Sequence, residues 1–252
     1  MKRSLCLLGL IASSAFAGYR YPVGERAVYK IMWGPLSCGT STISCDEIEL
    51  GGQPLIRIRI QAKSNKLVST IYPVDDRVDC FIDPETCLSV RLEKNTSEGG
   101  FVCKDILRLN REENTAYWDS QSGNISTNYP IDVEACDAVS FLYAFRRHDF
   151  QKNEARNFSI AVDSALHGIT ITAKGTDTKK IGHAGEVSCR KYIARPHRDD
   201  LFVRKIPEEI WLTDDDRKIL ARMDVKVPVG KARIVLVDYT PPLAEAGASV
   251  AR

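Results

Sequence analysis

The stretch Asp137-Ala-Val-Ser-Phe-Leu-Tyr-Ala-Phe-Arg-Arg147 carries the one strong helical pattern of this sequence. Its apolar residues recur at i, i+3, i+4 and i+7, which places them on one face of a helix: Ala138, Phe141, Leu142 and Phe145. Val139 and Tyr143 widen that face, so that little of the helix is left polar. Asp137 can accept hydrogen bonds from the first free backbone N–H groups. The pattern predicts one buried helix at about 137–148.

On both sides of this stretch the sequence has the alternation of β-strands. Residues 56–60 alternate isoleucine with arginine, as in a sheet that has one face on a core and the other in water. Asp83-Pro84 and Asp214-Asp-Asp-Arg217 separate alternating runs, as hairpin turns do. We therefore expect an all-β, mainly antiparallel fold, in which two curved sheets form a sandwich or half-open barrel around the helix.

The runs before and after the helix resemble each other. The pattern Phe81-x-Asp83-x-Glu85 recurs as Leu212-x-Asp214-x-Asp216, 131 residues later, and Gly39 corresponds to Gly168 at a spacing of 129. Two amphipathic hairpins with acidic turns can look alike by chance; alternatively, each half supplies an equivalent curved sheet. We expect a single β domain over residues 18–240, built from similar halves at about 24–119 and 153–240, with a flexible tail at 241–252.

The N-terminus has the pattern of a secretory signal peptide. Lys2 and Arg3 precede a short apolar run, and Ala15-Phe-Ala17 has the small residues of a cleavage site. Residues 1–17 are therefore expected to be removed on export. No later apolar run has the roughly 20 residues that a membrane-spanning helix needs, so no transmembrane segment is expected.

The charge of the exported chain is balanced. Residues 1–17 contain two of the 35 Lys and Arg residues and none of the 33 Asp and Glu residues, which leaves 33 of each. A nucleic-acid partner would favour a basic surface, so none is expected.

Seven cysteines remain after residue 17, and an odd number leaves at least one thiol outside any intramolecular disulfide. Cys80 and Cys87 flank an expected hairpin turn and could form a disulfide across it. Alternatively, the cysteines are small buried apolar residues, a role that free cysteine commonly has.

Motifs of enzyme chemistry are absent from the sequence. There is no Gly-x-Ser-x-Gly nucleophile motif and no pair of histidines one helical turn apart. Acidic clusters coincide with expected turns, where acidic residues are common. We expect no catalytic residues, no metal site and no cofactor. The remaining candidates are apolar residues that line a ligand pocket or simply form the core: Trp33, Phe141, Leu142, Phe145 and Trp211.

Several segments, in this order, resemble one known family. They are Gly24-Glu25-Arg26, Tyr29-x-Ile31-x-Trp33, Asp137 to Arg146, Leu201-Phe202, Ile210-Trp-Leu-Thr-Asp-Asp215 through Arg222, and Val229-Gly230. The chain resembles domain-of-unknown-function family 3108, whose members are exported bacterial proteins of mostly β structure. It departs from the family in its many cysteines and in Ile219-Leu220-Ala221, where the family tends to have a proline. The resemblance implies a periplasmic location and a shape akin to half-barrel lipoprotein carriers, and it supplies no catalytic residues.

These observations favour a non-catalytic, exported cell-envelope protein that binds an apolar or amphipathic ligand such as an acyl chain. The alternative is an envelope interaction or scaffold protein whose interior is filled by its own side chains. A hydrolase of envelope polymers is the third hypothesis, because a pair of carboxylates can be brought together by the fold alone. An open cavity beside the helix would favour the first hypothesis, and a packed core the second.

Overall fold

A computed structural model describes residues 20–182, 185–197, 207–227 and 230–243. The expected signal peptide at 1–17, Leu201-Phe202, Val229 and the end of the tail beyond residue 243 lie outside the described residues.

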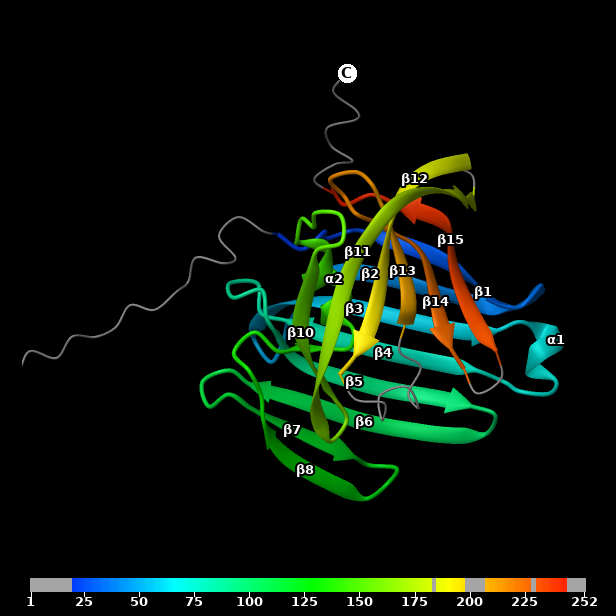
Figure 1. The fold of residues 1–252 in the computed structure, drawn as a ribbon. Helices are drawn as coiled ribbons and strands as arrows, with labels where there is room; N and C mark the ends of the chain where they lie inside the picture. The colour runs from blue at the N-terminus through cyan, green and yellow to red at the C-terminus, as the bar shows by residue number, and fades with distance from the viewer. Residues whose placement is uncertain (1–19, 183–184, 198–206, 228–229, 244–252) are drawn as a thin grey trace, which may run out of the picture.

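The described chain forms one sheet of fifteen strands with two short helices (Figure 1). Every pair of neighbouring strands is antiparallel except β9 and β10. The sheet order is β8-β7-β6-β5-β4-β3-β2-β1-β15-β14-β13-β12-β11-β10-β9. The elements are β1 (Arg26–Trp33), β2 (Leu36–Leu50), β3 (Gln53–Ser64), α1 (Lys66–Ser69), β4 (Asp75–Ile82), β5 (Ser89–Glu98), β6 (Phe101–Asn110), β7 (Thr115–Ser120), β8 (Ile125–Pro130), β9 (Cys136–Asp137), α2 (Ser140–Arg146), β10 (Ala155–Val162), β11 (Ala165–Ile181), β12 (Gly185–Pro196), β13 (Pro207–Thr213), β14 (Leu220–Lys226) and β15 (Lys231–Thr240).

The predicted β class with a buried helix is confirmed. The two curved parts of the sheet are joined edge to edge, because β1 pairs with β15 along its whole length. The sheet does not close: β8 ends it on one side and β9 on the other. The alternation predicted in β3 is also present, since Ile56 and Ile58 are buried while Arg57 and Arg59 lie on the other face.

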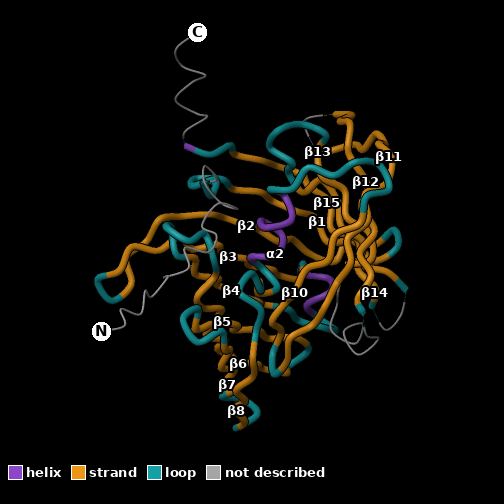
Figure 2. The backbone as a smooth tube through the Cα atoms, turned by 60° about the vertical axis from the view of Figure 1, so that its left-hand side comes forward, coloured by secondary structure: helices purple, strands orange, loops and turns teal. Residues whose placement is uncertain are grey.

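Helix α2 lies between the two parts of the sheet (Figure 2). Phe141 and Phe145 belong to the hydrophobic core formed mainly with β10–β15, and Tyr143 belongs to the core formed with β2–β7. The helix begins at Ser140, three residues later than predicted, because the backbone of Asp137 is already paired with β10. Its carboxyl nevertheless accepts hydrogen bonds from the N–H groups of Val139 and Ser140, at 2.7 and 2.9 Å.

Strands β1–β6 and β10–β15 share details that lie 131 residues apart. Cys87, in the β4–β5 turn, and Lys218, in the β13–β14 turn, both adopt left-handed backbone conformations, with φ of 57° and 46°. An ion pair of 2.6 Å between residues i and i+2 follows each turn. It joins Arg91 to Glu93 on β5, and Arg222 to Asp224 on β14. The two hairpins are thus equivalent in backbone shape as well as in sequence pattern.

Gly39 and Gly168 also occupy equivalent places, in β2 and β11, where a neighbouring strand leaves no room for a side chain. A Cβ atom at Gly39 would lie 2.1 Å from the carbonyl oxygen of Lys63. A Cβ atom at Gly168 would lie 2.2 Å from Nδ1 of His197. The obstacle is backbone in the first half and a rotatable side chain in the second.

The Gly39→Ala substitution is expected to lower the free energy of unfolding by about 2 kcal/mol, the usual cost of overpacking a site that cannot move. Gly168→Ala should cost less, because the His197 ring can turn away. Gly175→Ala is the matched control, since nothing lies within 4 Å of its Cβ position. Urea denaturation measures the free energy of unfolding of the three variants, which should decrease most for Gly39→Ala, less for Gly168→Ala and least for Gly175→Ala. Equal stabilities for Gly39→Ala and Gly175→Ala would contradict this prediction.

The Asp137→Ala substitution is expected to destabilise the fold by at least about 3 kcal/mol, because buried donors that lose their acceptor each cost roughly 1–3 kcal/mol. Asp137 is fully buried and accepts from two backbone N–H groups and from the Cys80 thiol. Asp238→Ala, an exposed site on β15, is the control and should change stability by less than about 0.5 kcal/mol. Similar thermal midpoints for both variants would show that the hydrogen bonds to the Asp137 carboxyl do not stabilise the fold.

Candidate functional site

A cleft of about 370 Å³ lies along one side of α2. Its walls come from the β4–β5 turn and the start of β5, the segment 132–136, one side of α2 and the first part of β10. Tyr21, which precedes β1, completes one end. The cleft thus forms where the helix leaves a space between two parts of the sheet that it otherwise fills.

One wall of the cleft is apolar. Leu88, Ala135, Ala144 and Phe158 all line it. The Phe158 ring is held in place by an edge-to-face contact with Phe141, with ring centroids 5.4 Å apart. Ala144 is the smallest side chain on this side of the helix, so its position determines how deep the cleft reaches.

The C-terminal end of α2 brings basic side chains to the cleft. Arg156 Nη1 lies 2.9 Å from His148 Nδ1, and its Nη2 donates to the backbone oxygen of Asp149 at 3.0 Å. Because a guanidinium only donates, Nδ1 must accept, which places the imidazole proton on Nε2. Burial, followed by the charges of Arg156 and Arg147, lowers the pKa of His148. His148 is therefore a neutral group between two cations.

Arg147 forms the second basic contact, on the side of Tyr21. Its Nη2 donates to the Tyr21 hydroxyl at 2.7 Å and to the Cys87 carbonyl oxygen at 3.2 Å. Its guanidinium carbon lies 5.1 Å from the centroid of the Tyr21 ring, in a cation–π arrangement. These contacts keep the guanidinium in one place at the cleft wall.

The floor of the cleft is a hydrogen-bonded polar network. Arg111 donates to the carbonyl oxygen of Ser89 through Nε at 2.9 Å and Nη2 at 2.5 Å. The hydroxyls of Ser89 and Ser140 are 3.2 Å apart, and Ser140 Oγ accepts from the Asp137 backbone N–H at 2.9 Å. The network joins β5, α2 and β9, which indicates a structural role for these polar groups.

Two cysteines line the cleft, and neither has the properties of a nucleophile. Burial, and then the charge of Asp137, raises the pKa of Cys136 to about 12. Burial also raises the pKa of Cys87. Since the thiolate is the reactive form, both groups are poor nucleophiles at neutral pH. In the described residues no group of three or more His, Cys, Asp or Glu side chains could hold a metal ion.

The disulfide expected between Cys80 and Cys87 is not present in the structure, where both are free thiols. Cys80 points into the core and donates to Asp137 Oδ2 at 3.1 Å. Cys87 lies at the left-handed position of the turn, where its thiol faces the Pro84 carbonyl oxygen at 3.9 Å. The two side chains are thus turned toward different partners, although they flank the same turn.

The five residues expected to line a pocket do not meet at the cleft. Phe141, Leu142 and Phe145 pack into or against the core, and the cavity beside Leu142 and Phe145 measures only about 20 Å³. Trp33 is exposed at the end of β1, whereas Trp211 is buried with the Arg222 guanidinium 4.4 Å from its ring centroid.

The residues that do shape the cleft were missed by sequence reasoning. Arg147 and His148 fall at the end of the predicted helix, at about 137–148, and Arg156 and Phe158 fall at the start of the second expected β half, at about 153–240. One signal in the sequence could have identified these residues: Arg147 and His148 continue the basic end of the helix, and Phe158 is the aromatic residue of the strand that follows. Contacts between β10 and α2 cannot be derived from periodicity alone.

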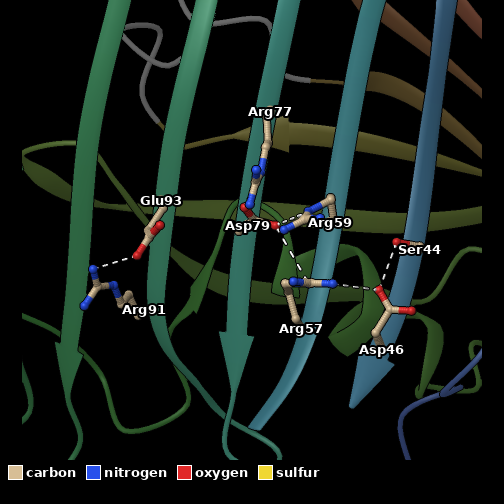
Figure 3. Close-up of polar contacts among 8 residues, drawn as sticks. All are labelled: Ser44, Asp46, Arg57, Arg59, Arg77, Asp79, Arg91 and Glu93. Carbon is tan, nitrogen blue, oxygen red and sulfur yellow. Dashed lines mark hydrogen bonds and ion pairs between the residues drawn. The ribbon is translucent and has the colours of Figure 1, made fainter. Parts of the chain in front are cut away.

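A second polar cluster covers the outer face of β2–β5 (Figure 3). Asp79 accepts from Arg59 Nε at 2.6 Å and from Arg77 Nε at 2.7 Å, and Arg57 Nη2 lies 3.4 Å from Asp46. Four arginines and three carboxylates pair here, both within β4 and β5 and between neighbouring strands. The cluster therefore stabilises the sheet.

The pKa of His148 is expected to lie below the 6.5 of a free imidazole. NMR titration of the ring protons measures it, and Arg156→Gln should move the inflection toward 6.5 by removing one cation. Because the folded pKa lies below the unfolded one, the stabilisation due to this group is present above the unfolded pKa and is lost as the pH falls through the folded pKa. An inflection at or above 6.5 in the unaltered protein would contradict this.

Comparisons with known proteins agree with the fold. No curated protein matches the sequence. A crystal structure of a β-barrel-like protein of domain of unknown function DUF1849 from Brucella abortus is similar, with a TM-score of 0.56 and 10% identity. The similarity covers 87% of this chain and 98% of the Brucella chain, and it supports the fold alone. The family model described as "Protein of unknown function (DUF3108)" matches residues 28–237, so the chain belongs to that family, as its motifs predict.

Proposed function

We propose that this protein is an exported, non-catalytic protein of the bacterial cell envelope that binds an amphipathic ligand in the cleft beside α2. The observation that carries the proposal is the cleft itself, with its volume of about 370 Å³. That volume falls within the range of small-molecule sites, roughly 300–1,000 Å³. The signal-peptide pattern of residues 1–17 supports export and a periplasmic location.

The lining of the cleft favours a ligand with an apolar chain and an anionic end. The chain would lie against Ala144 and Phe158. The anionic end would lie near Arg147, because guanidinium groups bind carboxylates and phosphates with paired hydrogen bonds. Arg156 is already paired with Glu154 at 2.7 Å, and Asp132 and Glu134 would exclude an anion from the other end of the cleft. An acyl chain with a carboxylate or phosphate head is the chemical class that meets both conditions.

The state of the polar groups supports binding without catalysis. The thiols in the cleft wall are protonated at neutral pH, and His148 is held by Arg156 through the nitrogen that would act as a base. Ser89 and Ser140 hydrogen-bond each other and the backbone of neighbouring elements. These contacts fix the shape of the cleft, as a preformed binding site requires.

The filled core favours a second candidate, an envelope interaction protein. Around Phe145 the rings of Phe150 and Tyr192 are packed edge to face, at 5.8 and 4.7 Å between centroids. This side of α2 therefore has no room for a ligand, and only the opposite side is open. A protein that acts through its surface alone would tolerate filling of the cleft without loss of function.

The Ala144→Phe substitution is expected to fill the cleft and weaken binding of an anionic amphiphile at least about tenfold. The probe is 1-anilinonaphthalene-8-sulfonate fluorescence, and native mass spectrometry of the purified protein checks for co-purified lipid. Ala62→Phe, at a partly exposed alanine of β3 that does not line the cleft, is the matched control and should bind as the unaltered protein does. Equal binding by both variants, or no binding and no co-purified lipid for the unaltered protein, would refute the proposal.

A further inference from the structure

Three turns at one end of the sheet are tied together by hydrogen bonds. Asn65, before α1, donates from its backbone N–H to the Cys38 carbonyl oxygen at 2.8 Å, and from Nδ2 to the Ser37 carbonyl oxygen at 2.5 Å. Gly99, in the β5–β6 turn, donates to the Pro73 carbonyl oxygen at 2.8 Å. The β1–β2 turn, α1 and the β5–β6 turn therefore form one continuous surface, on the right-hand side of Figure 1.

Large apolar side chains are exposed on this surface. It carries seven of the eleven such side chains in the described part of the chain, which we call the turn patch: Trp33, Leu36, Leu67, Ile71, Tyr72, Phe101 and Val102. Ile71 is 87% exposed, Phe101 72% and Leu67 69%. Single exposed apolar residues are ordinary, but seven of them gathered at neighbouring turns indicate an interaction site.

Two exposed lysines lie within the turn patch. In residues 33–38, 65–73 and 99–104 the charged side chains are Lys66 and Lys104, and both are exposed. Three acids flank the patch: Asp75 is paired with Lys63 at 3.2 Å, Asp76 accepts from the Ser97 N–H at 2.9 Å, and Glu98 is only partly exposed. The surface thus combines protruding apolar groups with two exposed lysines.

The geometry points to an anionic lipid surface as the partner that the turn patch binds. Its side chains project from the ends of separate hairpins, and Trp33 and Tyr72 are the aromatic types enriched at membrane–water interfaces. Two lysines among them complement anionic headgroups. Helix α1 has four residues, so contact is made by turns and not by an amphipathic helix.

The backbone of the turn around α1 is already hydrogen-bonded, as contact with a lipid surface requires. The Val68 N–H donates to Asn65 Oδ1 at 2.9 Å, and the N–H groups of Ile71 and Tyr72 donate to the Val68 carbonyl oxygen at 3.0 and 2.7 Å. Backbone groups that are already paired can enter a less polar region without the cost of losing water. In the described chain no helix is long and apolar enough to cross a membrane.

The turn patch and the cleft are separate. Ser89, at the start of β5, lines the cleft, whereas Glu98, at the end of β5, precedes the β5–β6 turn of the patch. Lipid-surface binding therefore does not rest on the proposed ligand in the cleft, and the two are tested with different variants.

Flotation of the mature chain with vesicles tests the proposal. Vesicles of phosphatidylethanolamine and phosphatidylglycerol should bind the protein, and the double variant Ile71→Ser, Phe101→Ser should bind at least about tenfold more weakly, because each side chain loses the benefit of burial. Lys66→Ser with Lys104→Ser should weaken binding several-fold on these vesicles and leave any binding to phosphatidylcholine vesicles unchanged.

Leu50→Ser is the matched control. Leu50 is 44% exposed and lies at the other end of β2, so its loss should leave vesicle binding unchanged. Thermal midpoints close to that of the unaltered protein establish that every variant is folded. The proposal is overturned if the unaltered protein floats with neither type of vesicle, or if Leu50→Ser weakens binding as much as the patch variant does. It is also overturned if light scattering shows a dimer that the patch variant abolishes while vesicles stay unbound.

Discussion

The buried carboxyl of Asp137 is the contact on which the arrangement of this fold depends. One oxygen accepts from the first two N–H groups of α2, and the other accepts from the Cys80 thiol on β4. The backbone of the same residue pairs with β10. A single residue thus connects both parts of the sheet to the start of the helix, through its side chain on one side and its backbone on the other, and it is fully buried, where no water can replace a lost partner.

The other end of α2 is held by a buried ion pair. Arg146 donates to both oxygens of Glu25, at 2.7 and 2.8 Å, and the Tyr239 hydroxyl donates to the same carboxyl at 3.0 Å. Glu25 precedes β1 and Tyr239 belongs to β15, so this cluster fastens the helix at the seam where the sheet halves join. With both ends fixed, one side of α2 must pack against aromatic rings while the opposite side faces the cleft.

The sequence predicts the strands and the helix well because both depend on local patterns. The alternation around Ile58 and the apolar face of Phe141 and Phe145 follow from periodicity, and the structure has both. The position of a ligand pocket, in contrast, does not follow from local patterns. Periodicity identifies a buried face, but it does not distinguish a packed neighbour from an empty space, so Phe141, Leu142 and Phe145, which pack into or against the core, look like pocket residues in the sequence.

The structure differs from the sequence-based expectation at two further places, again because the pattern along one segment does not show its neighbours. Trp211 is buried on the outer face of β13, where Lys179, Lys191 and Arg222 cover its ring, and no pattern along one strand shows which cations its neighbours supply. The first β half was expected to end at about residue 119, yet β8 occupies Ile125–Pro130. As the edge strand it pairs on one side only, and its exposed faces need no apolar alternation.

The details that recur at these spacings separate what the fold requires from what it does not. The crowded glycines, the left-handed turn position and the ion pair after the turn recur in both halves. Three of the exposed apolar groups correspond to smaller residues at the same spacings: Trp33 to Val162, Leu36 to Ala165 and Phe101 to Ala232, whereas Ile71 corresponds to Phe202. A hairpin of this shape therefore does not require the larger side chains at these three positions. Their size favours a role in contact with a partner over a role in the stability of the sheet.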